Sequence, residues 1–501
     1  NCRTGIAIQL ILFVTVALSC LFPVCVQAQE RGPNIVFFLV DDLGPDELVC
    51  YASKFHETPN IDALASQGMR FTNAYSGSTL CSPSRAAILT GRHPARLHLT
   101  DWIPGQTQIN VKSIVPDWKT YIDPDRVLLP EALKEQGYAT GFFGKWHLMP
   151  KPTTRIRESK DKDRMAELTA IFPEHYPEKH GFDENYGGDQ SANQGKRFLY
   201  PATKRFRNLQ NLGKEGDCVT DILTDCAVDF IERKKDQPFL VYLSYYTVHG
   251  PITGKPEYVK KYKQKLASNP DANYHMKNPG KAAMIQSLDE SVGRVVAKLK
   301  ETGELDETLI IFTGDNGSDY EEWVVNARGM KGTPYEGGTR VPLIVTGPGV
   351  ETGVCNVPTI GMDFYPTLLS YVDAPPKPNE HVDGVDITSL FKISGAIEDR
   401  PLYWHYPHYD KAPPYSSIIV DRWKLIHQTD DDTLELYNLK NDPMEKENLA
   451  AYLPRKRNAL LQELDEILNN ADAQRAERNP AYDPNRFSGG IRKFKVWGDK
   501  Q

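Results

Sequence analysis

The sequence predicts an α/β protein with a mixed, mostly parallel sheet between helices, followed by a smaller α+β domain with an antiparallel sheet. Three observations carry this prediction. Apolar runs rich in β-branched and aromatic residues alternate with helical patterns from residue 34 onward. Polar side chains follow several of these runs at the point where a strand should end. After about residue 390 the alternation gives way to short strands in succession.

The first elements are a buried strand and two helices. Residues 34–40 (NIVFFLV) form a continuous apolar run of the kind buried on both faces of a parallel sheet. Thr58 and Pro59 match an N-cap followed by proline at the first helical position, so a helix is expected to begin there. Residues 69–76 (MRFTNAYS) predict the next strand. Residues 84–91 (SRAAILTG) predict a helix that its glycine ends.

The same alternation continues through the following 200 residues or so. A helix is expected near Pro130, before a strand in residues 138–147 (YATGFFGKWH). Residues 238–249 (PFLVYLSYYTVH) predict another strand. Apolar residues at helical spacing over 284–299 predict a helix before the strand in 308–317 (TLIIFTGDNG).

Four polar residues mark one edge of the predicted sheet. Each follows an apolar run where a strand should stop: Asp41, His147, His249 and Asp315. In open α/β sheets, ligands bind beyond the carboxyl ends of the strands. One such coincidence would mean little, but four predict a shared site.

The C-terminal part has a different pattern of predicted secondary structure. Residues 403–409 (YWHYPHY), 416–428 (SSIIVDRWKLIHQ) and 433–439 (TLELYNL) predict short antiparallel strands. Residues 454–470 (PRKRNALLQELDEILNN) predict a helix that packs on them.

The first 28 residues predict export. Arg3 is the only charged residue before Glu30, and residues 6–26 are almost wholly apolar before a cleavage-like Val-Gln-Ala. An uncleaved anchor helix and a lipoprotein processed before Cys20 are the alternatives to a cleaved signal peptide. All three predict an exported protein, periplasmic or secreted, and cleavage leaves no stable membrane insertion.

Charge and cysteine content narrow the function further. The formal net charge of −7 argues against nucleic acid as a partner, so an anionic substrate must be held by local positive charge. Without the signal peptide, an odd number of cysteines remains, so at least one is unpaired or modified. These cysteines are Cys50, Cys81, Cys218, Cys226 and Cys355.

The most specific pattern begins at Cys81. This cysteine opens Cys-Ser-Pro-Ser-Arg, followed at 89–91 by Leu-Thr-Gly. The pattern resembles the signature of the type I sulfatases, in which the cysteine is oxidised to Cα-formylglycine by the formylglycine-generating enzyme. The position suits that role, because a hydrated aldehyde at a helix start has backbone N–H groups and the positive dipole end beside it. Arg85, one turn on, adds a fixed cation.

Three further segments extend the resemblance. Residues 144–147 (GKWH) are similar to the second sulfatase signature, and 315–317 (DNG) to its later metal motif. Residues 329–331 (GMK) with 336–342 (EGGTRVP) are similar to its lysine-bearing segment. The segments follow the family's order, and the nearest resemblance is to bacterial arylsulfatase-like carbohydrate sulfatases. It implies the fold of the alkaline phosphatase superfamily.

The resemblance also defines the expected domains. Residues 1–28 are the signal peptide, and residues 29–390 are the sulfatase catalytic domain. Residues 391–470 are the C-terminal α+β domain, and residues 471–501 are a polar tail.

A calcium ion is expected beside the nucleophile. Asp41, Asp42, Asp315 and Asn316 offer hard oxygen ligands, completed by the nucleophile at Cys81. Taken singly, Asp41-Asp42 could be a solvated strand end and Asp-Asn-Gly a simple turn; their joint appearance after strands favours a metal. Asn316 also belongs to the chain's one N-glycosylation sequon, and a metal ligand cannot carry a glycan. A two-zinc phosphatase or phosphodiesterase is less consistent with Asn316, since such sites use histidine ligands.

The resemblance implies a role for each catalytic residue. A hydroxyl of the formylglycine hydrate at residue 81 attacks sulfur, while calcium, Arg85, Lys145 and Lys331 neutralise charge on the ester oxygens. His249 and Lys331 protonate the departing alcohol oxygen, and His147 takes a proton from the remaining hydroxyl to release sulfate. Taken singly, Lys145 could be a surface lysine and His147 a core histidine.

The substrate is less well defined by the sequence. Residues 196–207 and 255–265 interleave cations with aromatic rings, although a charge run is usually a solvated face. The dense aromatic and imidazole groups of residues 403–409 are the better candidates. The resemblance implies that the small domain of sulfatases contributes to the pocket rim, so His405 and His408 are expected to contact sugar hydroxyls or a leaving-group oxygen. The alternative for these residues is a packed seam. Arg340 is a further candidate for substrate contact.

We therefore expect hydrolysis of sulfate monoesters on a sulfated polysaccharide or oligosaccharide, such as a galactan. A generic arylsulfatase is the closest alternative, and a phosphoester or phosphonate ester hydrolase is more distant. A non-catalytic binder of sulfated glycans on the same scaffold would need neither the cysteine nor a proton donor.

Overall fold

The computed structural model describes residues 31–106, 108–150, 172–270, 277–320 and 326–486. The predicted signal peptide and the end of the predicted tail lie outside the described residues. Within those ranges, no helix combines the length and the apolar character that crossing a membrane requires.

The central sheet has eight strands in the order β10-β2-β9-β8-β1-β7-β5-β6. β9 runs antiparallel to both of its neighbours, and the other paired strands run parallel, so the predicted mixed, mostly parallel sheet is confirmed. The bounds are β1 Asn34–Val40, β2 Met69–Phe71, β5 Ala139–Gly144, β6 Glu184–Tyr186, β7 Phe239–Tyr245, β8 Thr308–Gly314, β9 Leu343–Thr346 and β10 Gly353–Cys355.

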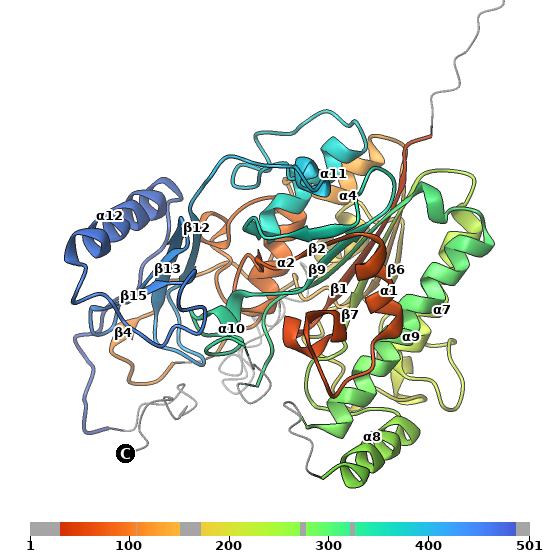
Figure 1. The fold of residues 1–501 in the computed structure, drawn as a ribbon, viewed down its shortest axis with the longest axis horizontal. Helices are drawn as coiled ribbons and strands as arrows, with labels where there is room; N and C mark the ends of the chain where they lie inside the picture. Colours follow the sequence, from red (N-terminus) through yellow and green to blue (C-terminus); the bar gives the residue numbers. More distant parts are fainter. Residues whose placement is uncertain (1–30, 107, 151–171, 271–276, 321–325, 487–501) are drawn as a thin grey trace, which may run out of the picture. The chain divides into compact units, whose positions relative to one another are not determined.

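Helices cover both faces of this sheet (Figure 1). Every residue of β1 is buried, because alternate side chains enter two different cores. Phe37 packs in the core beneath α2, α4 and α11, whereas Phe38 packs in the core beneath α1, α7 and α9. These helices span α1 Pro59–Gln67, α2 Cys81–Thr90, α4 Leu129–Lys134, α7 Val219–Lys234, α9 Pro279–Glu301 and α11 Phe364–Tyr371; α8 spans Pro256–Ser268 and α3 Pro94–Leu97.

One predicted strand is wrong. Residues 69–76 do not form a single strand, because β2 ends at Phe71 and the chain turns at Asn73, whose side chain donates to the Asn356 carbonyl at 2.6 Å. The remaining two residues form β3 (Ala74–Tyr75), which pairs with β11 (Thr359–Ile360) in a separate sheet. The apolar alternation runs through both strands and does not show the polar turn between them.

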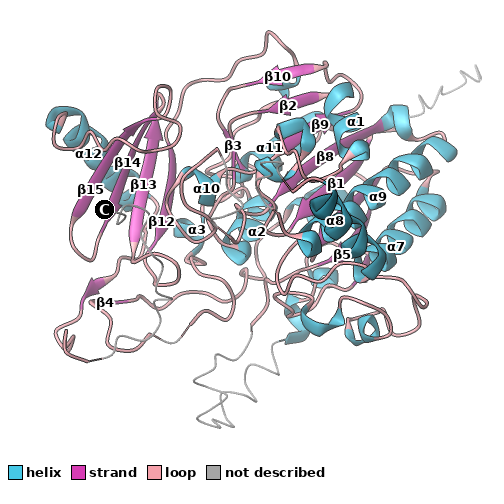
Figure 2. Ribbon diagram, turned by 60° about the horizontal axis from the view of Figure 1, so that its bottom comes forward, coloured by secondary structure: helices cyan, strands magenta, loops and turns pink. Residues whose placement is uncertain are grey.

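The C-terminal sheet is antiparallel, as predicted, and contains β12 Leu402–Tyr406, β13 Tyr415–Val420, β14 Trp423–Gln428 and β15 Thr433–Asn438. Figure 2 shows α12 (Pro454–Asn470) beside this sheet, and its buried leucines enter the core formed with it. Part of the predicted tail is also paired, since β16 (Glu477–Arg478) lies antiparallel to β4 (Ser113–Ile114).

A buried ion cluster joins this sheet to α10 (Glu336–Thr339). Lys424 of β14 is fully buried and lies 3.0 Å from a Glu336 oxygen and 2.9 Å from a Glu445 oxygen. Burial, opposed by Lys424, raises the pKa of Glu445 to about 7. Glu445 is therefore compensated by this ammonium, and Glu336 by the same ammonium together with Arg340, whose Nε lies 3.9 Å away.

Replacing Lys424 with methionine is expected to lower the free energy of unfolding by about 3 kcal/mol, because it leaves Glu445 buried without its cation and removes the nearer of two cations from Glu336. Urea unfolding followed by circular dichroism measures the change. Lys440→Met, at an exposed lysine of the same region, is the control and should leave the unfolding midpoint in place. An equal midpoint for both variants would contradict the prediction.

Candidate active site

Cys81 is the first residue of α2, three residues before the predicted start of this helix. Leu80 precedes it in extended conformation, and Gly91 ends the helix with φ 63°. The Cys81 side chain is 2% exposed, and its Sγ lies 3.3 Å from the Nζ of Lys331. Burial raises the pKa of the Cys81 thiol to about 11, although Lys145 and Lys331 oppose the shift. The unmodified side chain is therefore a thiol and not a thiolate at neutral pH.

The predicted oxygen ligands converge from two neighbouring strands. Asp41 and Asp42 follow β1, and Asp315 and Asn316 follow β8, which pairs with β1 in parallel. The Asp42 backbone N–H donates to Asp315 Oδ1 at 3.2 Å, and Asn316 Nδ2 donates to Asp42 Oδ1 at 2.7 Å. Parallel pairing thus brings residues more than 270 positions apart into direct contact.

These residues fit a divalent cation. Ligand atoms of Asp41, Asp42, Cys81 and His249 lie within 4.8 Å of one another. Three buried oxygens accept no hydrogen bond from the residues that the structure describes: Asp41 Oδ1, Asp42 Oδ2 and Asn316 Oδ1. Buried acceptors without partners are costly, and hard oxygens in such a set are what calcium binds. Because Asn316 is fully buried, it is also inaccessible to glycosylation.

Each carboxylate of the cluster has a cationic partner within 3 Å, and Arg85 also lies 3.8 Å from Asp41 Oδ1. Lys145 Nζ lies 2.7 Å from Asp41 Oδ2, and Lys331 Nζ lies 2.6 Å from Asp42 Oδ1. Arg85 contacts Asp315 Oδ2 through Nε at 2.9 Å and through its terminal nitrogen at 2.8 Å. These three pairs balance one another in charge. A divalent ion in the same cluster would make the site net positive, as an anionic ester requires.

Burial and neighbouring charges act in opposite directions on these carboxyl groups. Burial alone would raise the pKa of Asp42, but Lys331, His249 and Lys145 hold it below its ordinary value. Burial and then Asp41 raise the pKa of Asp315 to about 6, in spite of Arg85. By this balance of charges, Asp42 is more firmly ionised than Asp315.

The two predicted histidines lie at the ends of β5 and β7. His249 Nε2 lies 3.6 Å from Asp42 Oδ2, and its side chain is 18% exposed, so it stands at the mouth of the cluster. Its Nδ1 lies 2.6 Å from the Gly250 carbonyl oxygen. His147 is buried, with Nε2 2.5 Å from the Ile103 carbonyl oxygen. Ser82, next to Cys81, donates to the His147 carbonyl at 2.9 Å.

Two functional contacts were missed from the sequence. Ser244 of β7 accepts from Arg85 at 2.5 Å and donates to the Lys145 carbonyl at 2.6 Å. A serine inside an otherwise apolar, fully buried strand was an available signal. Lys281 of α9 lies 3.3 Å from the Asp42 carbonyl oxygen and 2.9 Å from Glu47. Nothing in the sequence distinguishes this lysine from others on helices.

The structure does not bring the predicted substrate residues into this cluster. His405 is buried, with its ring nitrogens 2.8 Å from Ser416 Oγ and 2.7 Å from the Gln474 carbonyl oxygen. His408 is also buried, with Nε2 2.7 Å from Thr100 Oγ1. Both rings are engaged within the fold, which is the packed seam that the sequence left as the alternative.

Two further substrate candidates, Arg340 and the basic segment 255–265, are also bonded within the fold. Arg340 donates to the Thr72 carbonyl instead of reaching Cys81. In the basic segment 255–265, Lys255, Lys261 and Lys265 form ion pairs with acidic neighbours.

A nucleophile position beside a cation-binding cluster, at the carboxyl edge of a mostly parallel sheet, suits a hydrolase of anionic esters. The chain belongs to the sulfatase family, since the family model described as sulfatase matches residues 33–374. A second model, N-sulphoglucosamine sulphohydrolase, C-terminal, matches residues 330–474. The protein is therefore a sulfuric ester hydrolase.

Individual relatives span nearly the whole chain. A sulfatase from Formosa agariphila is 32% identical, with 85% of this chain and 86% of the relative covered. Human arylsulfatase A is 28% identical, with 88% of each covered. The crystal structure of Ps i-CgsB in complex with k-i-k-neocarrahexaose has a TM-score of 0.70 and 28% identity, covering 87% of this chain and 93% of that chain. The predicted alkaline-phosphatase-like fold is confirmed.

Proposed function

We propose that this protein hydrolyses sulfate esters on a sulfated polysaccharide or oligosaccharide, with a formylglycine at residue 81 and one calcium ion. The observation that carries the proposal is the placement of Cys81. It stands at the start of a buried helix, beside Lys331 and within 4.8 Å of two carboxylates of the cation-binding cluster. The likeness to a sulfatase structure that holds a neocarrahexaose supports a carbohydrate as the substrate.

The residues of the chain divide the chemistry among them. Asp41, Asp42, Asp315 and Asn316 hold calcium, which when bound polarises the ester oxygens. Conversion of the Cys81 thiol to a hydrated aldehyde supplies a nucleophilic oxygen that a buried thiol lacks. Lys331 neutralises charge beside the nucleophile.

Lys145 and Arg85 keep the carboxylates fixed and charged. Lys145 pairs with Asp41, and Arg85 pairs with Asp315 while also donating to the Lys145 carbonyl at 2.7 Å. This linked arrangement holds both cations toward the ester without a change in geometry during the reaction.

Proton transfer is assigned to two histidines and one lysine around the cluster. His249 and Lys331 donate to the departing sugar oxygen, and His147 accepts a proton from the hydroxyl at residue 81. A sugar hydroxyl is a poor leaving group, so its protonation matters more than that of an aryl oxygen.

The test is peptide mass spectrometry on residue 81, using protein coexpressed with a formylglycine-generating enzyme. The expected fragment carries an aldehyde in place of the thiol. Fully active protein with an unmodified Cys81 would overturn the proposal.

We also propose export, through the predicted signal peptide at residues 1–28, to the periplasm or the medium.

The likeness to arylsulfatase A makes a generic arylsulfatase the second candidate. Sulfate release measured by ion chromatography on defined sulfated oligosaccharides and on 4-nitrophenyl sulfate separates the two. A higher kcat/KM on 4-nitrophenyl sulfate than on every oligosaccharide would favour the arylsulfatase.

His249→Gln is expected to lower kcat on a sugar sulfate by about 10²-fold or more, but on 4-nitrophenyl sulfate by less than about tenfold. The reason is that 4-nitrophenolate departs without a proton. His405→Gln is the matched control, because its ring bonds within the fold, and it should leave the ratio of the two rates unchanged. Equal losses on both substrates for His249→Gln would exclude it as the proton donor.

A further inference from the structure

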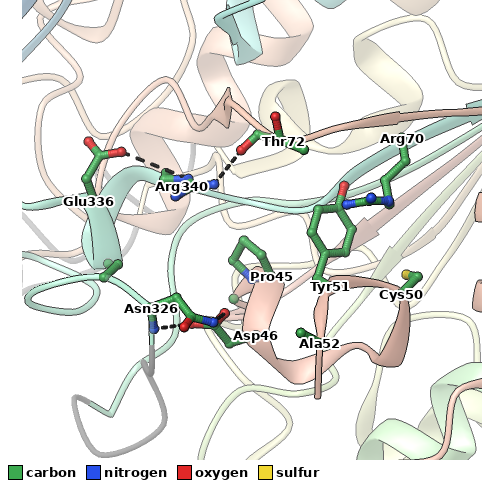
Figure 3. A pocket seen from close by; sticks show the side chains of 13 residues that line it. Pro45, Asp46, Cys50, Tyr51, Ala52, Arg70, Thr72, Asn326, Glu336 and Arg340 are labelled. Atoms are coloured by element: carbon green, nitrogen blue, oxygen red, sulfur yellow. Dashed lines mark hydrogen bonds and ion pairs between the residues drawn. The ribbon is translucent and has the colours of Figure 1, made fainter. Parts of the chain in front are cut away.

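A cavity of about 330 Å³, separate from the catalytic cluster, lies near the carboxyl edge of the central sheet (Figure 3). Its volume falls in the range of ligand pockets, about 300 to 1,000 Å³. The residues proposed above for catalysis and calcium binding are absent from its described lining. That lining comes from the loop after β1, from the end of β2 and from the α10 segment: Gly44, Pro45, Asp46, Cys50, Tyr51, Ala52, Arg70, Thr72, Asn326, Ala327, Glu336, Gly337 and Arg340.

Two guanidinium groups enter this cavity from opposite sides in Figure 3. Arg70 of β2 lies over the Tyr51 ring, 5.1 Å from its centroid, and its guanidinium forms no hydrogen bond or ion pair with any residue that the structure describes. Arg340 follows α10 and donates to the Thr72 carbonyl, with its Nε 3.9 Å from Glu336. Arg70 is half-buried, so its N–H donors are held beside the cavity without protein acceptors.

The acidic groups of the lining are already engaged. Glu336 lies 3.0 Å from Lys424 Nζ and accepts from the Tyr75 hydroxyl at 2.9 Å. Both Asp46 oxygens accept from Asn326, at 2.7 and 3.0 Å. The N–H groups of Arg70 therefore remain as hydrogen-bond donors without acceptors at this cavity, and the group that carries them is positively charged.

The cavity is suited to binding and not to covalent chemistry. Cys50 is the thiol of its lining, and burial followed by Asp62 raises the pKa of Cys50 to about 12. This cysteine is therefore a thiol at neutral pH and a weak nucleophile.

We propose that this cavity is a second sulfate-binding site, in which Arg70 and Arg340 hold one sulfate group between them. The planar fork of a guanidinium matches two oxygens of a tetrahedral anion, and two such forks on opposite walls match one sulfate. The sulfate is either an ester elsewhere on the polymer or the inorganic product, and the first source rests on the proposed function.

The first source explains the position of the cavity. The Gly44–Asp46 loop that lines it is separated by one residue from the Asp41-Asp42 pair of the catalytic cluster. A polysaccharide with a sulfate on several sugars can therefore occupy the catalytic cluster with one ester and the cavity with another. Binding at both places would favour polymers over short substrates.

The experiment uses the Cys81→Ala protein, which binds without turnover, and isothermal titration calorimetry. The probes are a sulfated galactose hexasaccharide, a singly sulfated monosaccharide and sodium sulfate. Arg70→Met and Arg340→Met, each added to Cys81→Ala, are expected to weaken hexasaccharide binding about tenfold and monosaccharide binding by less than about twofold. Arg475→Met is the matched control, because Arg475 pairs with Asp465 on an exposed part of α12.

The outcomes separate the two sources. Weaker hexasaccharide binding with unchanged sodium sulfate binding supports a site for the polymer, and weaker sodium sulfate binding supports a site for the product. Unchanged affinity for all probes in both variants overturns the proposal. If either variant unfolds, crystals of the parent protein soaked in sodium selenate decide the question, since anomalous scattering between Arg70 and Arg340 is expected and its absence overturns the site.

The proposed function fails independently of this site. Protein that releases no sulfate from any ester, but binds selenate between the two arginines, would overturn the proposed function and keep the second site. Active protein with no affinity difference in the variants would do the reverse.

Discussion

Replacing Cys81 with alanine is expected to lower kcat/KM for sulfate esters by about 10⁴-fold or more. Under the proposed function, the substitution removes the oxygen that forms a bond to sulfur, and the surrounding cations cannot replace that oxygen. Sulfate release by ion chromatography, on protein matured with a formylglycine-generating enzyme, measures the loss. The effect should be of similar size on aryl and sugar sulfates, because both need the nucleophile.

Cys355→Ala provides the control for a buried cysteine, since Cys355 is 9% exposed at the end of β10 and touches none of the catalytic groups described above. It should retain activity within about twofold of the parent. Thermal unfolding of both variants checks that neither has lost its fold. A Cys81→Ala protein with more than about one tenth of the parent activity would remove residue 81 from the reaction.

The positions of the central strands could be predicted because their burial is uniform. β1 begins and ends where the run NIVFFLV does, since both of its faces are covered and every residue is apolar except the first. The parallel connection then places Asp41 and Asp315 at one edge, which is a property of topology and needs no side-chain detail. The clustering of these predicted residues follows from that rule.

Other features depend on information that periodicity does not contain. The imidazoles of His405 and His408 lie in a dense aromatic segment, but the sequence does not state whether this segment faces a ligand or its own fold. The structure shows internal partners for both, Ser416 and Thr100. Lys281 reaches the Asp42 carbonyl only because α9 crosses the end of β1, a tertiary contact that spans 239 positions. Periodicity also gives no information on the partners of Arg70, a strand residue. Only the three-dimensional structure shows that its guanidinium has no hydrogen-bond acceptor among the described residues.

The charge balance of the catalytic cluster supports the proposed calcium ion. The three carboxylates of Asp41, Asp42 and Asp315 are matched in number by three cations, with Arg85 between Asp315 and Asp41: Lys145, Lys331 and Arg85. Such a cluster is stable but offers an anion no net attraction. The unpartnered oxygens of Asp41, Asp42 and Asn316 are the places where added positive charge would be held. Calcium would then contribute both to the fold and to the attraction of sulfate.

Asp42→Asn is therefore expected to abolish calcium binding and to lower kcat/KM by about 10³-fold or more, since it removes a charged ligand and leaves Lys331 without its carboxylate. Inductively coupled plasma mass spectrometry of the dialysed protein should find about one calcium per chain in the parent and far less in the variant.

Unfolding supplies a readout that does not require turnover. For the parent, a free calcium concentration of about 1,000 times Kd should add about 4 kcal/mol to the free energy of unfolding, and a chelator should remove it. Asp46→Asn, on the same loop, should keep both the metal and its stabilisation, because Asp46 bonds to Asn326 and not to the cluster. If the Asp42→Asn and Asp46→Asn proteins retain equal calcium and respond equally to the chelator, the ion is held elsewhere, and the unpartnered oxygens at the end of β1 need another explanation.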